Sequence, residues 1–270
     1  MNNSRLMTPF AGPAVGDVSL PGSKSHMNRA LLCAALSEGR SRLSGVLFAD
    51  DTEAMLEAIV LLGATVEVDR RNLEIEVTGL AGAPNFRDLV IDARSSGTTS
   101  RFLLPTLAGG TGVVTLDGAQ QLRSRPFAEQ IEALRDLGCD LEELGAPGQL
   151  PVKISSQGLE GGEVEISAET SSQFISGLML AAPLYTNGLK IKLTGVPVSR
   201  PYLELTVKVM RDFGVSVEKP DEFTYVVPPG RYRAIEAQIE PDASAASYFF
   251  AAASITQGRV KIVGLHRGSY

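Results

Sequence analysis

Four short segments of the sequence place small, hydroxylated and charged residues at the start of an apolar stretch. They are SKSHMNRALL around Ser25, RSSGTTSRFLL around Ser96, ETSSQFISGL around Ser172 and PDASAASYFF around Ser244. A helix N-terminus leaves backbone N–H groups unpaired and carries about half a positive charge, so it suits an anion. Lys24 and Arg29 add two cations about one helical turn apart. The chemistry that these residues predict is the binding of a phosphate or a carboxylate.

The same residues also have a simpler structural interpretation. Ser, Thr and Asp are favoured N-caps, so each serine could serve only as a cap, and the same holds for Asp51 and Asp242 at two helix starts. A cap needs one hydroxyl, whereas the run 170–173 (TSSQ) offers several donors in a row, as phosphate oxygens require. Capping and ligand binding both remain open. The further candidates for ligand contact are Ser95, Gly97, Thr98, Arg101, Arg125, Ser199 and Tyr202.

Two sets of markers recur with one spacing along the chain. The four serine segments are about 70 to 75 residues apart, and so are three helix ends at Gly63, Gly138 and Gly214, each followed by a strand pattern. Within each repeat the pattern predicts strand, helix, strand, helix, strand, strand. The sequence therefore predicts an α/β protein built from βαβαββ modules of roughly 70 residues.

The two helices of each module differ in polarity. Segments such as RPFAEQIEALRDLG have one charged and one apolar face and are expected to cover a sheet. Segments such as FLLPTLA and FISGLMLAAPL are apolar on all sides, which predicts helices buried among one another with the sheets outside them. Residues 21 to about 232 hold three modules, and 235–270 begin a fourth whose helix we expect to be poorly buried.

Composition and charge exclude several classes of protein. The formal net charge is −6, and no Lys and Arg stripe is present, which argues against a nucleic-acid partner. No apolar run approaches the roughly 20 residues of a membrane span, and the first residues lack a secretory h-region, so we expect a cytoplasmic protein. Two cysteines and two histidines, far apart in the sequence, support no metal site and no disulfide framework.

The motifs, taken in order, resemble the family of 5-enolpyruvylshikimate-3-phosphate synthase, the enolpyruvyl transferase of the shikimate pathway. The similar motifs are LPGSKSxxNRALLxAAL, DDTxxM, SGTTxRFL, RPxxxxIxALRxLG, ETSSQFxSGLMLAAPL, VSRPYLELTxxxMxxFG and PDASAASYFFAAAxI. The sister family, UDP-N-acetylglucosamine enolpyruvyl transferase, shares the fold but typically has GSKN at the first motif. The resemblance implies an inside-out α/β barrel, the enolpyruvyl transferase fold, with three complete modules and a partial fourth.

The resemblance also implies a reaction and a set of residues. Phosphoenolpyruvate would donate its enolpyruvyl group to the 5-hydroxyl of shikimate 3-phosphate, releasing phosphate, with no cofactor and no metal. Lys24 would be catalytic and lie between the substrates. The shikimate 3-phosphate contacts would be Lys24, Ser25, Arg29, Ser171, Ser172, Gln173, Ser199 and Tyr202. The phosphoenolpyruvate contacts would be Lys24, Gly97, Arg125 and Gln173, while Ser95 stands where the family usually has asparagine.

Members of this family have a longer chain with two similar domains. By resemblance, residues 21–234 would form the substrate-binding domain, and 1–20 and 235–270 would belong to a second domain that is truncated. We therefore expect a cytoplasmic monomer that is inactive in isolation and whose partner would be a complementing C-terminal fragment. The alternatives are a non-catalytic shikimate 3-phosphate-binding fragment and a transferase acting on UDP-N-acetylglucosamine.

Overall fold

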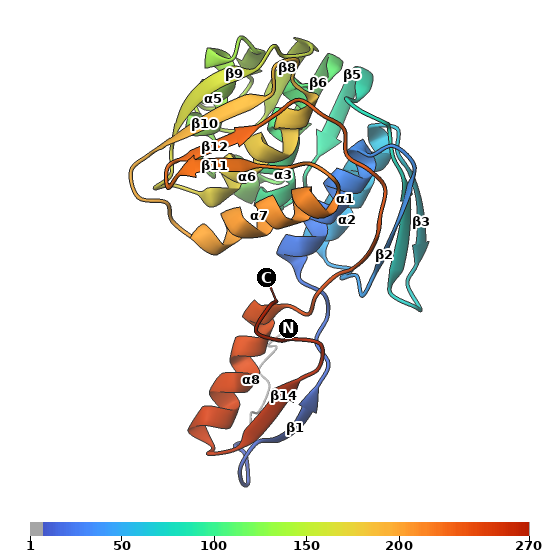
Figure 1. The fold of residues 1–270 in the computed structure, drawn as a ribbon, viewed down its shortest axis with the longest axis vertical. Helices are drawn as coiled ribbons and strands as arrows, with labels where there is room; N and C mark the ends of the chain where they lie inside the picture. The colour runs from blue at the N-terminus through green and yellow to red at the C-terminus, as the bar shows by residue number, and fades with distance from the viewer. Residues whose placement is uncertain (1–7, 270) are drawn as a thin grey trace.

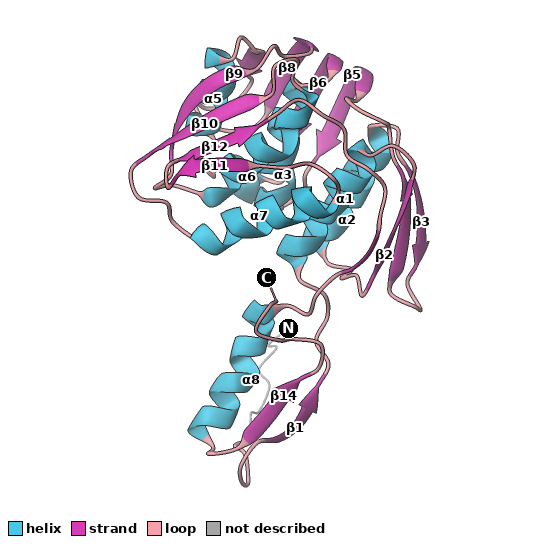
Figure 2. Cartoon of the chain, in the orientation of Figure 1, coloured by secondary structure: helices cyan, strands magenta, loops and turns pink. Residues whose placement is uncertain are grey.

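The computed structural model describes residues 8–269 of the chain, which form a large body and a small unit (Figure 1). Two chain segments connect them, one entering helix α1 and one leaving strand β13. Figure 2 shows strands along the outside of the large body, with α3 and α6 among them and α7 along its lower edge. None of the described helices is long and apolar enough to cross a membrane.

The large body contains three four-stranded sheets with the same internal order. The first is β13 (Glu236–Gln238), β2 (Arg40–Ser44), β4 (Glu74–Thr78) and β3 (Thr65–Asp69). The second is β5 (Asn85–Asp92), β6 (Thr111–Asp117), β8 (Val152–Gln157) and β7 (Asp140–Glu143). The third is β9 (Gly162–Ser167), β10 (Leu189–Thr194), β12 (Thr224–Val227) and β11 (Glu218–Asp221). In each sheet the first two strands are parallel and the other neighbours antiparallel, so one arrangement occurs three times.

Strand β13 corrects one expected boundary. The resemblance implied that residues 235–270 belong to a second domain, yet Glu236 to Gln238 pair in parallel with Arg42 to Ser44 of β2. In the other two sheets this position is held by β5 and β9, the first strands of their own modules. The first module has no such strand before α1, because its chain arrives from the small unit. A strand from after the third module therefore completes its sheet.

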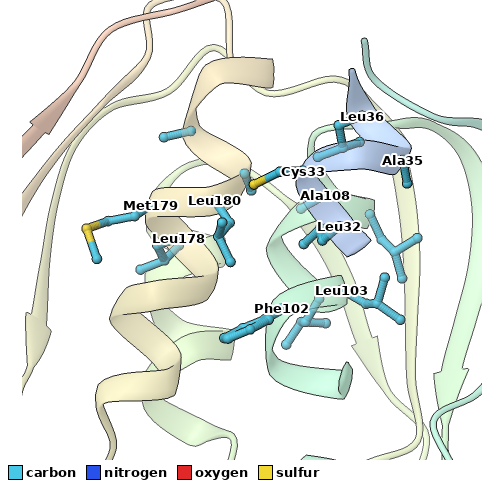
Figure 3. Packing of buried hydrophobic residues seen from close by; sticks show 14 of the residues in the cluster. Leu32, Cys33, Ala35, Leu36, Phe102, Leu103, Ala108, Leu178, Met179 and Leu180 are labelled. Atoms are coloured by element: carbon cyan, nitrogen blue, oxygen red, sulfur yellow. The ribbon is translucent and has the colours of Figure 1, made fainter. Parts of the chain in front are cut away.

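The helices divide into buried and covering sets, as their polarity predicts. The buried set is α1 (Lys24–Leu36), α3 (Gly97–Ala108) and α6 (Ser172–Ala181), the last continued by the 3-10 turn η1 (Ala182–Leu184). Every residue of α3 is buried, as is every residue of α1 from His26 onward. Figure 3 shows Leu32, Phe102 and Leu180, one from each helix, in the apolar core that these helices share. The remaining helices of the body are α2 (Asp50–Leu61), α4 (Gln120–Arg123), α5 (Ala128–Asp136) and α7 (Arg200–Asp212).

The small unit joins the two ends of the described chain. Strand β1 (Val15–Val18) pairs in parallel with β14 (Arg259–Ile262), and α8 (Ala243–Ile255) lies beside them (Figure 1). Helix α8 is apolar, yet Ala246 is its one buried residue. Tyr248 is 77% exposed and Ile255 is 81% exposed. The expected poor burial of this helix is confirmed, because within residues 8–269 little of the chain packs against its apolar side chains.

Candidate functional site

A cavity of about 480 Å³ opens where five helices begin. The residues that line it are Lys24, Ser25 and Arg29 of α1, Thr98 of α3, Thr170, Ser171, Ser172 and Gln173 at α6, Val198, Ser199 and Tyr202 at α7, and Asp242 and Ser244 at α8. Because the starts of α1, α3 and α6 reach one cavity, their unpaired N–H groups and partial positive charges act on the same space. All four serine segments recognised in the sequence contribute to it.

Capping accounts for one polar residue in each segment. Ser23 caps α1 by accepting from His26 N at 3.4 Å, and Ser96 caps α3 by accepting from Thr99 N at 3.1 Å. Ser171 caps α6 through Gln173 N at 3.2 Å, and Asp242 caps α8 through Ser244 N at 2.8 Å. The capping interpretation is confirmed for these four residues, and it leaves their neighbours to be explained.

Three further hydroxyls at the cavity are free for a ligand. Within residues 8–269, the side chains of Ser25, Ser172 and Ser199 have no hydrogen-bond partner. Ser199 precedes α7 in the left-handed conformation, with φ of 56°, and its hydroxyl does not cap the helix. A non-glycine residue in this region is strained, and such strain concentrates at functional sites. Hydroxyls that neither cap nor pair suit the oxygens of a bound anion.

Lys24 is held at the cavity by a carboxylate from α2. Its Nζ lies 3.2 Å from Oδ2 of Asp51, while Oδ1 of Asp51 accepts from the Ser96 hydroxyl at 2.8 Å. Asp51 thereby links the openings of α1 and α3. The predicted capping role of Asp51 is wrong, because α2 begins one residue earlier and Ala49 is its N-cap. Thr52 completes that turn by accepting from Ala49 N at 2.9 Å.

Arg29 is buried, although it lines the cavity. Its side chain donates to Thr206 Oγ1 at 2.7 Å, the Ser25 carbonyl at 2.8 Å, Ser176 Oγ at 3.1 Å and the Tyr202 carbonyl at 3.2 Å. The guanidinium also lies 4.8 Å above the centre of the Phe102 ring. Burial lowers the pKa of Arg29 to about 9. Arg29 therefore ties α1 to α6 and α7 as well as facing the cavity.

A second group of cations gathers around Gly97. A Cβ at Gly97 would lie 2.8 Å from a terminal nitrogen of Arg125, 3.7 Å from one of Arg101 and 3.8 Å from Gln173 Oε1. Arg101 donates to Gln173 Oε1 at 2.8 Å, and Gln173 Nε2 donates to Thr98 at 3.3 Å. Burial, with Arg125 as the next cause, lowers the pKa of Arg101 to about 10. Two neighbouring guanidinium groups favour an anion between or beside them.

The remaining expected residues divide as follows. Ser95 is half-buried in the loop before α3, and it neither lines the cavity nor makes a side-chain hydrogen bond within the described chain. Gly22, the glycine of the LPGSKS motif, has a packing role, because a Cβ there would lie 2.2 Å from the Gly45 carbonyl oxygen. Sequence reasoning missed Thr206 and Ser176, which hold Arg29. Their spacing was the available signal, since each follows a candidate residue, Tyr202 or Ser172, by one helical turn.

Comparison with known proteins gives a consistent result. The family model described as EPSP synthase (3-phosphoshikimate 1-carboxyvinyltransferase) matches residues 11–270. Curated proteins named 3-phosphoshikimate 1-carboxyvinyltransferase from Sulfurovum sp. (strain NBC37-1) and Aliivibrio fischeri (strain ATCC 700601 / ES114) are 40% and 41% identical over 94% of this chain. The chain spans 60% of the length of each of them.

A solved structure supports the same fold. The EPSP synthase from Acinetobacter baumannii, at 2.37 Å, superposes with a TM-score of 0.79 and 24% sequence identity. The match covers 94% of this chain and 56% of that one. At this identity the likeness speaks for the α/β fold.

Proposed function

This chain belongs to the EPSP synthase family, and on that premise we propose that it takes part in transferring the enolpyruvyl group of phosphoenolpyruvate to the 5-hydroxyl of shikimate 3-phosphate. One observation carries the proposal: the family motifs at α1, α3, α6, α7 and α8 meet at a single cavity. Free hydroxyls, helix N-termini and two cations line that cavity, as a phosphorylated carboxylic acid requires.

The large cavity would bind shikimate 3-phosphate. Ser171, Ser172, Gln173 and Ser199 would hold the phosphate, because they lie at the openings of α6 and α7. Ser25 and Arg29 would hold the carboxylate, and the Tyr202 ring would lie beside the cyclohexene ring of the ligand. Asp242, the N-cap of α8, also lines the cavity, where its carboxylate can accept from ligand hydroxyls.

Phosphoenolpyruvate would bind next to it, at the cations around Gly97. Gly97, Arg125 and Gln173 lie together, with Arg101 and Thr98 bonded to the same glutamine. Lys24 would reach this ligand from the opening of α1. The absence of a side chain at Gly97 leaves the Arg125 guanidinium accessible to a phosphate.

The proposed reaction balances without any redox step. The methylene carbon of phosphoenolpyruvate takes a proton, and the 5-hydroxyl oxygen bonds to the adjacent carbon as it loses its own proton. The tetrahedral intermediate then loses phosphate and a methyl proton, which regenerates the double bond. Fixed cations stabilise the concentrated negative charge, and the Lys24 ammonium is our candidate for moving the proton.

We also propose the domain organisation that the family implies. The three sheets and buried helices would be the three modules of an inside-out α/β barrel, spanning residues 21–234 and completed by β13. Residues 1–20 and the part of 235–270 after β13 would belong to a second domain, of which relatives have more. The exposed face of α8, including Tyr248 and Ile255, would contact that further segment.

The chain alone would then bind ligand without turning it over. Domain closure excludes water and completes a site of this kind. In the small unit, the apolar helix α8 is mostly exposed within the described residues. We expect calorimetry to detect shikimate 3-phosphate binding to the isolated chain, and we expect a phosphate-release assay with both substrates to detect no ordinary turnover. Addition of the complementing C-terminal segment of a relative should restore turnover.

Two alternatives make different forecasts in the same experiments. A non-catalytic binding fragment would bind shikimate 3-phosphate and would stay inactive when the complementing segment is added. A transferase for the nucleotide sugar would bind UDP-N-acetylglucosamine and leave shikimate 3-phosphate unbound. No binding of either ligand by a folded chain, checked by circular dichroism, would overturn the proposed function.

A further inference from the structure

We propose that Thr206 is a positioning residue, which acts with Ser176 to hold Arg29 so that Arg29 fixes Ser25 and Tyr202 against each other at the cavity wall. This inference rests on the proposed function for its ligand. Thr206 and Ser176 are both fully buried, and neither lines the cavity. They therefore act through the residues that do.

The hydrogen bonds around Arg29 nearly exhaust its donors. A guanidinium has five N–H groups, and the four bonds to Thr206, Ser25, Ser176 and Tyr202 leave one on the terminal nitrogen that faces Ser25. A bidentate clamp on a ligand carboxylate needs two such groups. Arg29 as placed here can give a carboxylate one hydrogen bond, so most of its effect on binding must pass through the groups it holds.

The two hydroxyls complete this network from inside the protein. Thr206 Oγ1 accepts from Arg29 Nε at 2.7 Å and lies 2.8 Å from both Ser176 Oγ and the Tyr202 carbonyl. Because the Thr206 hydroxyl has one proton, it donates to one of these groups, and the Ser176 hydroxyl can donate to it in turn. Buried networks of this kind are rigid when every member is satisfied.

The network fixes three helix openings relative to one another. Arg29 reaches the carbonyl of Ser25 on α1 and that of Tyr202 on α7, while Ser176 follows Ser172 by one turn on α6. Loss of the Thr206 hydroxyl would leave Arg29 Nε without a buried partner and free the guanidinium to move. The helices would then keep their fold, but the N-termini of α1, α6 and α7 would no longer be held in fixed positions relative to one another at the cavity.

The test compares two substitutions at one position. Thr206→Val keeps the shape of the side chain and removes the hydroxyl, whereas Thr206→Ser keeps the hydroxyl and removes the methyl group. Thr106→Val is the matched control, since Thr106 is also fully buried and its hydroxyl donates only to Phe102 O of its own helix at 2.8 Å. Each full-length variant is titrated with shikimate 3-phosphate by calorimetry, and its urea unfolding is measured.

We expect Thr206→Val to bind shikimate 3-phosphate at least about tenfold more weakly, while Thr206→Ser and Thr106→Val stay within about threefold of the parent. A spectroscopic arm follows the Arg29 Nε–H signal in ¹H–¹⁵N spectra. This proton should be protected from exchange in the parent and in Thr206→Ser and should lose protection in Thr206→Val, together with shifts in the Ser25 and Tyr202 amides.

Each other outcome decides against a specific claim. Parent-like binding by Thr206→Val, or an equal loss in Thr206→Ser, would show that packing rather than the hydroxyl matters and would overturn the inference. If the parent chain does not bind shikimate 3-phosphate, the proposed function fails. The exchange of Arg29 Nε–H then tests by itself whether Thr206 and Ser176 hold Arg29. An Arg29 Nε–H that exchanges as fast in the parent as in Thr206→Val would overturn it.

Discussion

Replacing Lys24 by methionine removes one positive charge from the cavity and keeps most of the apolar stem. Lys24 Nζ lies 3.2 Å from the carboxylate of Asp51, and the two side chains are 42% and 28% exposed. Without the ammonium group, the Asp51 carboxylate remains near the opening of α1 without its cation. The variant therefore loses an attraction for an anionic ligand and retains a repulsion that the ammonium had offset.

The expected magnitude follows from the separation and the exposure. Two unit charges about 4 Å apart interact by about 4 kcal/mol at an effective dielectric constant of about 20, and by about 1 kcal/mol in bulk water. Because the Lys24 side chain is partly exposed, we place the lost attraction at about 1–2 kcal/mol. That energy corresponds to binding of shikimate 3-phosphate weakened by roughly 5- to 30-fold.

Calorimetry at low and at physiological ionic strength measures this loss and its screening by salt. Lys190→Met is the matched control, because Lys190 is 43% exposed and pairs with Glu163 at 2.9 Å on the third sheet, away from the cavity. The double variant with Asp51→Asn should recover part of the affinity, since it removes the remaining repulsion. Binding by Lys24→Met within twofold of the parent, or an equal loss in Lys190→Met, would refute this reasoning.

Three further predictions concern stability and assembly. Gly177→Ala should lower the free energy of unfolding in urea by about 2–3 kcal/mol, because its Cβ would lie 2.2 Å from the Arg101 carbonyl oxygen. Gly97→Ala should lower it by under about 1 kcal/mol, because only a terminal nitrogen of Arg125 must move. Equal losses in the two variants would contradict this prediction. Burial lowers the pKa of His26 to about 4 in the folded chain, against 6.5 when unfolded, so the unfolded state binds the extra proton as pH falls from about 6.5 toward 4. The unfolding free energy should therefore drop by about 2 kcal/mol between pH 7 and pH 5. His26→Gln should lack this drop, and an equal drop in that variant would contradict the assignment to His26. Ile255→Ser should change the stability of the isolated chain by under about 0.5 kcal/mol, because the residue is 81% exposed, yet weaken pull-down of a complementing C-terminal segment; unchanged capture would count against the assigned contact.

Much of the architecture could be predicted from periodicity. The spacing of Gly63, Gly138 and Gly214 placed the ends of the outer helices, and each glycine has a positive φ. The contrast between amphipathic and wholly apolar helices predicted which would be buried, as the complete burial of α3 demonstrates. These features depend on local sequence, so a single chain is enough to reveal them.

The missing parts depend on long-range contacts. Nothing in the residues 236–238 marks them as the partner of β2, because a short strand with two polar residues has a weak pattern. Asp51 has the composition of an N-cap, and only the position of Lys24 and Ser96 reveals that it pairs instead. Arg29 could be recognised as important. The one-turn spacing of Thr206 and Ser176 from Tyr202 and Ser172 marks them as neighbours of candidate residues, but their hydrogen bonds to Arg29, 177 and 147 residues away, depend on the fold.

The position of β13 also has a consequence for the order of folding. Its Ala237 lies 193 residues after Ser44, whose hydroxyl donates a hydrogen bond to the Ala237 carbonyl. The first sheet therefore contains the longest-range strand pairing of the body. Until the ribosome has released the third module, β2 presents an unpaired edge, and such an edge can recruit strands of other chains. We expect nascent chains that stop before residue 236 to aggregate more readily than chains that include it, so late docking of three residues would protect the earliest module.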